Sequence, residues 1–476
     1  MSKKFYITTA IPYVNANPHI GMALEYVQAD VLARYHRQKG DDVFFLTGAD
    51  ENSLKNVQAA EKEGLSAKEL VDRNTEKFIA ATKALNISND DFIRTTAKKH
   101  FLGAQKLWSA CKKEDIYKKK YRGLYCVGCE QFYTEKELVD GKCPEHQKEP
   151  EVVEEENYFF RLSNYQKKLE KLIESDEYKI FPESRKNEVL SFIRMGLEDF
   201  SISRSQKRAK NWGVPLPDDE SQVMYVWFDA LSNYITALDY DSNGKNFKKY
   251  WPADAHIIGK GIIRFHAVYW PAMLMSSGIK LPKNLFVHGY INIEGGKMSK
   301  SLGNVIDPLE LVSKYGVEPV RYYLLRHINP FTDSDFSIEQ FEKAYTADLA
   351  NGLGNVVSRV AGLIEQNPVK IEIREQKTEN RDFKKLIDGF LFDQALKYIW
   401  DKIAEIDGLI SETKPWELAK AGKLKEVEKI LNQAANEIYQ ISQLLIPFLP
   451  QTAEKIEKIF IAKQIKKADP LFPRLT

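Results

Sequence analysis

Two short segments of the sequence combine residue types that could handle phosphate groups. The first is Pro18-His19-Ile20-Gly21, between a stretch predicted as a strand and one predicted as a helix. A helix N-terminus presents free N–H groups and a positive dipole end, so it can receive phosphate. His19 could donate a hydrogen bond there, and Gly21 leaves room for a nucleotide. Alone, a proline-histidine pair at a helix start is more often a simple cap.

The second segment is Gly295-Gly296-Lys297-Met298-Ser299-Lys300-Ser301. Its glycines predict a loop. Lys297 and Lys300 are point charges suited to a triphosphate whose negative charge moves towards a leaving pyrophosphate. An exposed basic loop is the simpler interpretation of a lysine pair, but five specified residues, 297–301, are harder to explain in that way.

A third group of residues has the spacing of a metal site. Two residues separate Cys126 from Cys129, and two separate Cys143 from His146. Such pairs on neighbouring turns can close a tetrahedral zinc site, and four protein ligands leave no open position, so we predict a structural zinc. Buried cysteines with a chance histidine are the alternative. The chain has only four cysteines, which suits a metal site in a reducing compartment better than a disulfide framework.

The elements that must position these residues follow from hydrophobic patterning. Strand-like stretches alternate with helix-like ones; the strands are expected at 5–10, 43–48, 91–96, 256–259 and 285–290, and the helices at 19–39, 66–85 and 262–277. This alternation predicts an α/β fold with a doubly wound, Rossmann-like parallel sheet. Further helices are expected at 349–366, 384–414 and 425–448, which predicts an α-helical bundle.

The same patterning predicts four regions along the chain. Residues 1–117 are expected to form the first half of the catalytic sheet, and 118–225 an insertion that splits the sheet and carries the zinc ligands. Residues 226–345 are expected to complete the sheet and carry the 297–301 loop, and 346–476 to form the helical bundle.

Composition narrows the class of protein. The 476 residues are 43% hydrophobic and 29% charged, as in an ordinary globular protein of more than one domain. No apolar run approaches the length of a membrane span. The net charge of +2 excludes a strongly basic chain, so any nucleic-acid contact must come from local patches and shape.

Longer stretches around these motifs resemble one known family. Similarity to methionyl-tRNA synthetases, which are class I aminoacyl-tRNA synthetases, extends over essentially the whole chain and is clearest at 9–21, 25–36, 44–48, 225–230 and 288–290. The resemblance implies a cytoplasmic enzyme that uses ATP with Mg²⁺ to join L-methionine to tRNA(Met) through a methionyl adenylate. It implies ATP binding by His19, Gly21 and residues 297–301, with His19, Lys297 and Lys300 as catalytic residues.

The resemblance also implies a methionine site. Its apolar and aromatic side chains suit a flexible thioether, since sulfur packs well against aromatic edges. The site maps onto Ile11, Tyr13, Trp227, Tyr234, Ile262 and His266, with Asp50 holding the substrate ammonium. Ile262 and His266 are four residues apart and share a helical face. Taken singly, each of these residues could be ordinary core.

In the helical region, the family's anticodon-reading set maps onto Asn355, Arg359, Pro415 and Trp416. Amide and guanidinium groups can read base edges, and an indole can stack on an unstacked base. Arg359 could equally be a surface charge and Trp416 a bundle anchor. The chain lacks the RNA-binding domain that many relatives append after the bundle, so we expect a monomer.

Three departures from the family lie near the expected active site. Met22 stands where relatives have a second histidine, Asn52-Ser53 where they commonly have His-Gly, and Gly261 where they usually have aspartate. Leu231 replaces a common proline, a change expected to be mild. Losing one transition-state donor can lower a rate by ~10²–10³. The hypothesis is an active enzyme whose rate these changes could reduce.

Two alternatives stay open. One is a synthetase-like protein that binds methionine or tRNA without efficient activation, although retained Lys297 and Lys300 argue against it. The other is a class I ligase for a branched aliphatic amino acid. Such ligases usually carry a much larger editing insertion than 118–225 could provide together with a zinc site.

Overall fold

The computed structural model describes residues 2–128, 130–144, 147–293, 295–297, 305–374 and 380–475. It divides into two compact units. The first comprises Met1–Pro18, Asp41–Lys83 and Ser88–His288, and the second His19–Gly40, Ala84–Ile87 and Gly289–Thr476. The four regions expected from the sequence stay a prediction.

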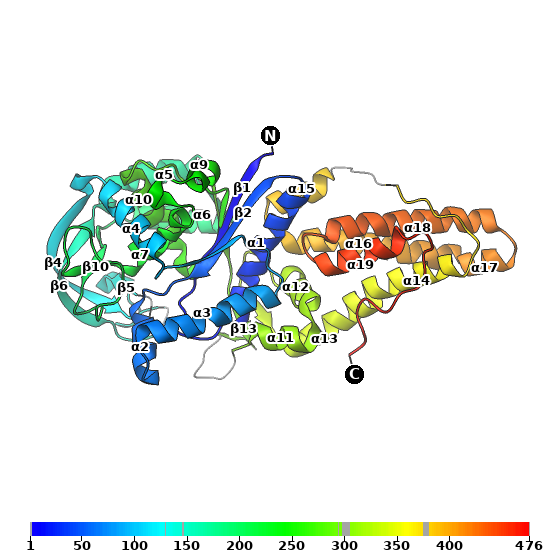
Figure 1. Cartoon of the computed structure of the whole chain (residues 1–476), viewed down its shortest axis with the longest axis horizontal. Helices are drawn as coiled ribbons and strands as arrows, with labels where there is room; N and C mark the ends of the chain where they lie inside the picture. The colour runs from blue at the N-terminus through cyan, green and yellow to red at the C-terminus, as the bar shows by residue number, and fades with distance from the viewer. Residues whose placement is uncertain are drawn as a thin grey trace. The chain divides into compact units, whose positions relative to one another are not determined.

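A parallel sheet of six strands, in the order β3-β2-β1-β11-β12-β7, forms the centre of the first unit. Figure 1 shows two of these strands, β1 and β2, side by side. The strands are β1 (Lys4–Thr9), β2 (Asp42–Ala49), β3 (Asp91–Arg94), β7 (Lys179–Phe181), β11 (Ala255–Gly259) and β12 (Asn284–His288). Their central residues are almost fully buried, as expected when helices cover both faces of a parallel sheet. The α/β fold class and the five strands expected from the sequence are confirmed.

The sixth strand, β7, lies inside the range expected for the insertion. It pairs with β12, and Ile180 lies opposite Leu285. The first unit's helices are α2 (Leu54–Glu63), α3 (Ala67–Ala84), α4 (Lys98–Ala110), α5 (Gln166–Glu174), α6 (Glu183–Arg194), α7 (Val226–Leu231), α8 (Asn233–Thr236), α9 (Lys245–Tyr250) and α10 (Trp270–Ser276).

The helix expected at 262–277 is present over 263–276, but its first half is not a regular α-helix. A 3₁₀ turn (Lys260–Ile262) and a π-helical segment (Phe265–Tyr269) precede α10. π-helical segments are rare overall, and those that do occur inside helices often lie at functional sites. Apolar spacing does not distinguish the two helix types.

Antiparallel strands between residues 116 and 224 form two further sheets. A four-stranded sheet has the order β5-β4-β6-β8 and a two-stranded sheet joins β9 to β10. The strands are β4 (Ile116–Cys126), β5 (Gln131–Tyr133), β6 (Glu151–Phe160), β8 (Phe200–Ser201), β9 (Ser203–Ser205) and β10 (Gln222–Met224). A continuous ladder joins β4 to β6, and Cys126 is the last residue of β4.

The second unit is built mainly of helices, together with a small sheet of the order β14-β13-β15. Its elements are α1 (Ile20–Gln38), β13 (Ile291–Ile293), β14 (Gly296–Lys297), α11 (Pro308–Tyr315), α12 (Val317–Arg326), β15 (Ser334–Phe336), α13 (Ile338–Ala344), a π-helical segment (Tyr345–Gly354), α14 (Asn355–Glu365), α15 (Arg381–Asp388), α16 (Phe392–Thr413), α17 (Pro415–Lys420), α18 (Leu424–Leu445) and α19 (Pro450–Phe460). The predicted bundle is confirmed: α18 packs against α14, α16 and α19 (Figure 1).

The helix expected at 384–414 is wrong, because it is two helices. Gly389 ends α15, and Phe390 takes a left-handed conformation (φ 58°) before α16 begins.

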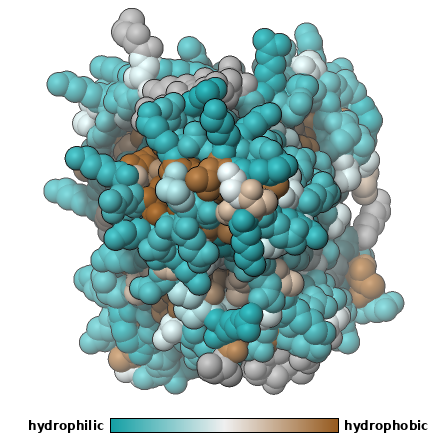
Figure 2. Space-filling view, turned by 90° about the vertical axis from the view of Figure 1, so that its right-hand side faces the viewer, coloured by the Kyte–Doolittle hydropathy of each residue, from teal (hydrophilic) through white to brown (hydrophobic). Residues whose placement is uncertain are grey.

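On the bundle, residues 367–373 and 460–466 contribute to a groove of about 640 Å³. Figure 2 shows a face on which hydrophilic side chains surround a smaller group of apolar ones. In the described residues, none of the helices is both long and apolar enough to cross a membrane.

A buried arginine ties α1 to the bundle within the second unit. Arg321, on α12, lies 2.7 Å from the Asp30 carboxylate, and neither side chain is exposed. Its guanidinium also donates to the carbonyl oxygens of Phe448, Leu85 and Pro447. The five N–H groups of arginine suit this role, since one buried side chain satisfies acceptors from several segments.

Candidate functional site

Two loops that follow neighbouring parallel strands bring together two of the residues predicted to bind methionine. Tyr13 follows β1 and Asp50 follows β2, and these two residues form an isolated bridge. The N–H of Asp50 donates to the carbonyl of Pro12 at 2.9 Å. The carboxyl ends of parallel strands lie at one edge of the sheet, where ligands of such folds usually bind.

Trp227 adds an aromatic wall to these residues. It lies on α7, with its ring centroid 6.5 Å from that of Tyr13 in an edge-on arrangement. It also stacks on Phe265, with ring centroids 3.7 Å apart. Phe265 was not among the predicted site residues, because in the sequence it resembles any core aromatic of that helix. Among the described residues, the buried indole Nε1 of Trp227 has no hydrogen-bond partner.

Tyr234 and His266 form a buried polar pair in the same unit. The Tyr234 hydroxyl lies 2.7 Å from His266 Nε2, and His266 Nδ1 lies 3.0 Å from the carbonyl oxygen of Ile262. A carbonyl can only accept, so Nδ1 carries the proton and Nε2 accepts from Tyr234. Burial lowers the pKa of His266 to about 4, so the ring is neutral at physiological pH.

Asp50 supplies a carboxyl group that is 2% exposed. Burial raises its pKa well above the ordinary value, and the negative charges of Asp229 and Glu130 raise it further. A cation placed beside Asp50 would therefore stabilise its ionised form. This environment suits the binding of an ammonium group.

Asn52, one of the departures from the family, is hydrogen-bonded in this interior. Its side-chain N–H groups donate to Asp229 Oδ2 at 2.8 Å and to the carbonyl of Thr95 at 3.0 Å. His100 Nε2 bonds the other oxygen of Asp229. The neighbouring Ser53 caps α2, its hydroxyl accepting from the N–H of Asn56. Both residues thus have local structural partners that explain their types.

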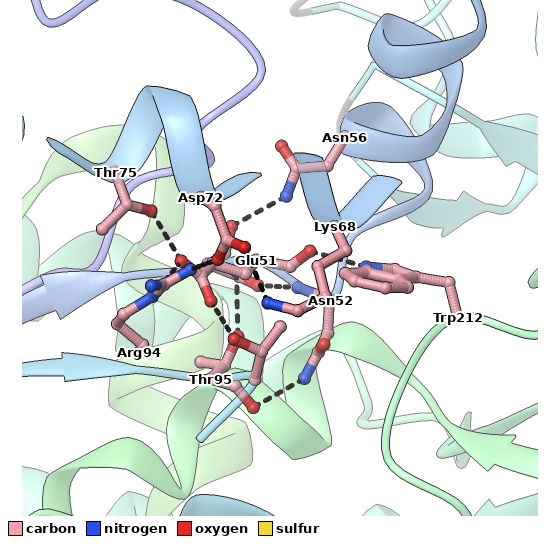
Figure 3. Close-up of polar contacts among 11 residues, drawn as sticks. Glu51, Asn52, Asn56, Lys68, Asp72, Thr75, Arg94, Thr95 and Trp212 are labelled. Atoms are coloured by element: carbon pink, nitrogen blue, oxygen red, sulfur yellow. Dashed lines mark hydrogen bonds and ion pairs between the residues drawn. The ribbon is translucent and has the colours of Figure 1, made fainter. Parts of the chain in front are cut away.

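A network around Glu51 holds the turn that carries Asp50 and Asn52 (Figure 3). The buried Glu51 carboxylate accepts from the Thr75 hydroxyl at 2.5 Å and from Arg94 Nε at 2.7 Å. Trp212 Nε1 donates to the Glu51 carbonyl at 2.8 Å. Sequence reasoning missed this network because its members lie on separate elements and match no short motif.

The predicted phosphate-binding helix start is present in the second unit. His19 is the N-cap of α1, and its Nδ1 accepts from the N–H of Gly21 at 3.2 Å. Met22 lies in the first turn of the same helix. The N–H of Ile20 donates to the carbonyl of Ile306 at 3.0 Å.

The lysine motif is described only in part. Lys297 lies in β14, opposite Asn292 of β13. Met298, Ser299, Lys300 and Ser301 lie outside the described residues, as does the side chain of Lys297. The third departure, Gly261, lies in the 3₁₀ turn after β11, beside Ile262.

Two of the four predicted zinc ligands lie in one small buried cluster. Cys126 ends β4, and Cys126 and Cys143 are 4% and 0% exposed and cluster with Tyr133. The Cys143 Sγ lies 3.5 Å from the Tyr133 hydroxyl. Cys129 and His146 lie outside the described residues, and the described part of the chain holds no group of three candidate ligands. Two thiols converging on one cluster fit half of a tetrahedral thiolate site.

The predicted anticodon residues gather at one place on the bundle. Arg359, on α14, donates to Asp407 at 2.9 Å and to Ser411 at 3.1 Å, both on α16. Its guanidinium carbon lies 5.3 Å from the ring of Trp416, at the start of α17. The exposed Asn355 lies one turn before Arg359, and the buried Pro415 begins α17.

Comparisons with known proteins agree with this fold and site. A model of the family "tRNA synthetases class I (M)" matches residues 5–149 and 145–361. The chain therefore belongs to the class I tRNA synthetases, within their methionine family.

Its relatives include methionine–tRNA ligases. That of Thermotoga maritima is 43% identical, over 95% of this chain and 74% of the relative. That of Brucella melitensis is 44% identical, over 98% and 93%. Among solved structures, methionyl-tRNA synthetase from Mycobacterium tuberculosis in complex with methionyl-adenylate is similar, with a TM-score of 0.91 and 38% identity over 99% of this chain and 100% of that one. The family predicted from the sequence is confirmed.

Proposed function

We propose that this chain joins L-methionine to tRNA(Met), using ATP and passing through a methionyl adenylate. The proposal is supported by 43% identity to a methionine–tRNA ligase and by two groups within one unit, Tyr13 with Asp50 and Trp227, and Tyr234 with His266. Each of these residues could be ordinary core alone, whereas aromatic side chains next to the buried Asp50 carboxyl suit an amino acid with an apolar side chain.

The methionine-binding residues would divide the amino acid between them. Asp50 receives the ammonium group, which neutralises a buried negative charge. Tyr13, Trp227 and Ile262, with Ile11, provide aromatic and aliphatic surface for the thioether. The Tyr234–His266 pair stays uncharged at neutral pH because burial lowers the pKa of His266 to about 4, so the side-chain pocket has no cationic histidine.

Activation of methionine breaks one bond and forms another. The methionine carboxylate attacks the α-phosphorus of ATP, and the bond to pyrophosphate breaks. His19 and Gly21 would hold phosphate oxygens at the start of α1, and Lys297 and Lys300, in the segment with Met298, Ser299 and Ser301, would stabilise charge on the leaving group. Mg²⁺ bound with ATP supplies further neutralisation. Positioning and charge stabilisation supply most of the catalysis in such transfers.

In the second reaction, a ribose hydroxyl of the terminal adenosine of tRNA attacks the methionyl carbonyl, and AMP leaves. Asn355, Arg359, Pro415 and Trp416 would read the anticodon. The cation–π contact between Arg359 and Trp416 supports this role, since it presents an indole and a guanidinium together. We also propose that the protein acts as a monomer and in the cytoplasm.

A zinc ion held by Cys126, Cys129, Cys143 and His146 would be structural. The burial of Cys126 and Cys143 in one cluster supports it, because two cysteine side chains brought together can supply half of a tetrahedral site. Its role would be to fix the turn between β4 and β5.

Methionine-dependent exchange of labelled pyrophosphate into ATP tests the function. Exchange with methionine but not with leucine or isoleucine is expected, and the variant Lys300→Ala should lower it by ~10²–10³. Exchange with isoleucine or leucine would support a ligase for a branched amino acid instead. Methionine binding without exchange would support a binding protein. Met22→His and Gly261→Asp, which restore the residue types usual in relatives, would then be the first variants to test for a gain of exchange.

A further inference from the structure

Glu130 connects three segments of the first unit. It follows the predicted zinc ligand Cys129, and its residue is 1% exposed. It is not among the predicted methionine, ATP or zinc residues. Its backbone is left-handed, with φ 49°, which is uncommon for glutamate and is retained only where surrounding contacts hold it.

The side chain of Glu130 contacts two of these segments. One carboxylate oxygen accepts from the Tyr13 hydroxyl at 3.4 Å. The other accepts from the backbone N–H of Lys55 at 3.1 Å, in the first turn of α2. A carboxylate at a helix N-terminus satisfies a free N–H and complements the helix dipole. The Lys55 ammonium also lies 4.6 Å from the Tyr13 ring, so the two contacts support each other.

The backbone of Glu130 contacts the third segment. Its carbonyl oxygen accepts from the hydroxyl of Tyr225, the N-cap residue of α7. The guanidinium of Arg204 lies over the rings of Tyr225, at 4.7 Å, and Tyr125, at 4.1 Å. This buried cation places positive charge near the Glu130 carboxylate and packs the tyrosine in place.

The three contacted segments carry, or directly adjoin, residues that we propose to bind methionine. Tyr13 is itself one of them, α2 begins directly after the turn of Asp50, and α7 carries Trp227. We propose that Glu130 is a positioning residue for methionine recognition, which fixes Tyr13, the start of α2 and Tyr225 relative to one another. This inference rests on the proposed methionine site and deepens it.

Glu130 also links that site to the proposed zinc turn. The residue lies between β4 and β5, and the conformation of this turn sets where its carboxylate and carbonyl point. A change at this turn should therefore alter methionine binding through Glu130.

A double-mutant cycle on the full chain tests the inference. Methionine dissociation constants are measured by calorimetry for wild type, Glu130→Ala, Tyr13→Phe and the double variant. Glu130→Ala should raise the dissociation constant about tenfold, which corresponds to about 1.4 kcal/mol. The double variant should bind no worse than Glu130→Ala alone, because the Tyr13 hydroxyl acts through Glu130. Additive effects would overturn the inference.

Two further measurements separate positioning from general damage. The KM for ATP in pyrophosphate exchange and the zinc content by mass spectrometry should stay within twofold of wild type in Glu130→Ala. The control is Glu154→Gln, because the side chain of Glu154 is exposed on β6. This variant should leave the dissociation constant for methionine unchanged. An equal rise in the KM for ATP, or loss of zinc, would overturn the inference.

If Glu130→Ala fails to fold, Tyr225→Phe carries the test. It removes only the hydroxyl that Glu130 accepts from, and it should raise the methionine dissociation constant several-fold with the KM for ATP unchanged. An unchanged methionine constant would overturn the inference. If the wild-type chain itself does not bind methionine, the proposed function fails together with it, whereas normal wild-type binding with an unaffected variant overturns the inference alone.

Discussion

Acidification should destabilise the first unit through His266, and the size of the effect follows from its burial. The unfolded histidine has a pKa of about 6.5, and burial lowers the folded pKa to about 4. The folded state therefore binds the proton less well than the unfolded state. The neutral ring contributes stability above about pH 6.5, and that contribution is lost as the pH falls towards 4. The total decrease in the free energy of unfolding is about 3 kcal/mol, of which about 2 kcal/mol has been lost when the pH reaches 5.

Comparison of the wild type with His266→Gln isolates this effect. The free energy of opening of β1 and β11, measured by native-state hydrogen exchange, should fall between pH 8 and pH 5 by about 2 kcal/mol more in the wild type. A titration of labelled histidine side chains by NMR should show no protonation of His266 above pH 5. Equal pH dependence in the two proteins, or an NMR pKa near 6.5, would refute the reasoning.

Three further predictions concern other residues. Asn52→Asp places a second carboxylate beside the buried Asp229 and removes its donor, so it should lower the free energy of unfolding by about 2–5 kcal/mol; an unchanged urea midpoint would contradict this. Cys143→Ser should abolish bound zinc, as measured by native mass spectrometry, and full retention of zinc would show that the ligand set is different. Trp416→Ala should raise the KM for tRNA by roughly 5–100-fold while pyrophosphate exchange stays unchanged, and an equal loss in both reactions would exclude a role confined to tRNA.

The strands of the central sheet could be predicted because each is an apolar run between helices. The range expected at 43–48 lies within β2 (Asp42–Ala49), for example. The edge strand β7 has only three residues, Lys179–Phe181, and acquires its identity from β12 beside it. A pattern read along the chain contains no such information about the neighbour.

The site could be predicted where a residue's role depends on its own chemistry. Asp50 and Tyr13 lie together as expected, because the ends of adjacent parallel strands must meet. Phe265 and Glu130 were missed because their roles depend on partners far away in the sequence. The stacking of Phe265 on Trp227 also needs the π-helical segment, which hydrophobic spacing does not predict.

The buried arginine of α12 has a consequence for synthesis on the ribosome. The second unit combines residues 19–40 and 84–87 with 289–476, so α1 is made early and most of the unit is made late. Asp30 meets Arg321 only after the whole first unit has been translated, and the carbonyls of Pro447 and Phe448 come later still. During this interval α1 exposes an apolar face, and Asp30 can pair with Arg34 of its own helix but not yet with Arg321. Such long-range pairing slows folding and exposes the nascent chain to aggregation, so the second unit should be the part that benefits most from a chaperone.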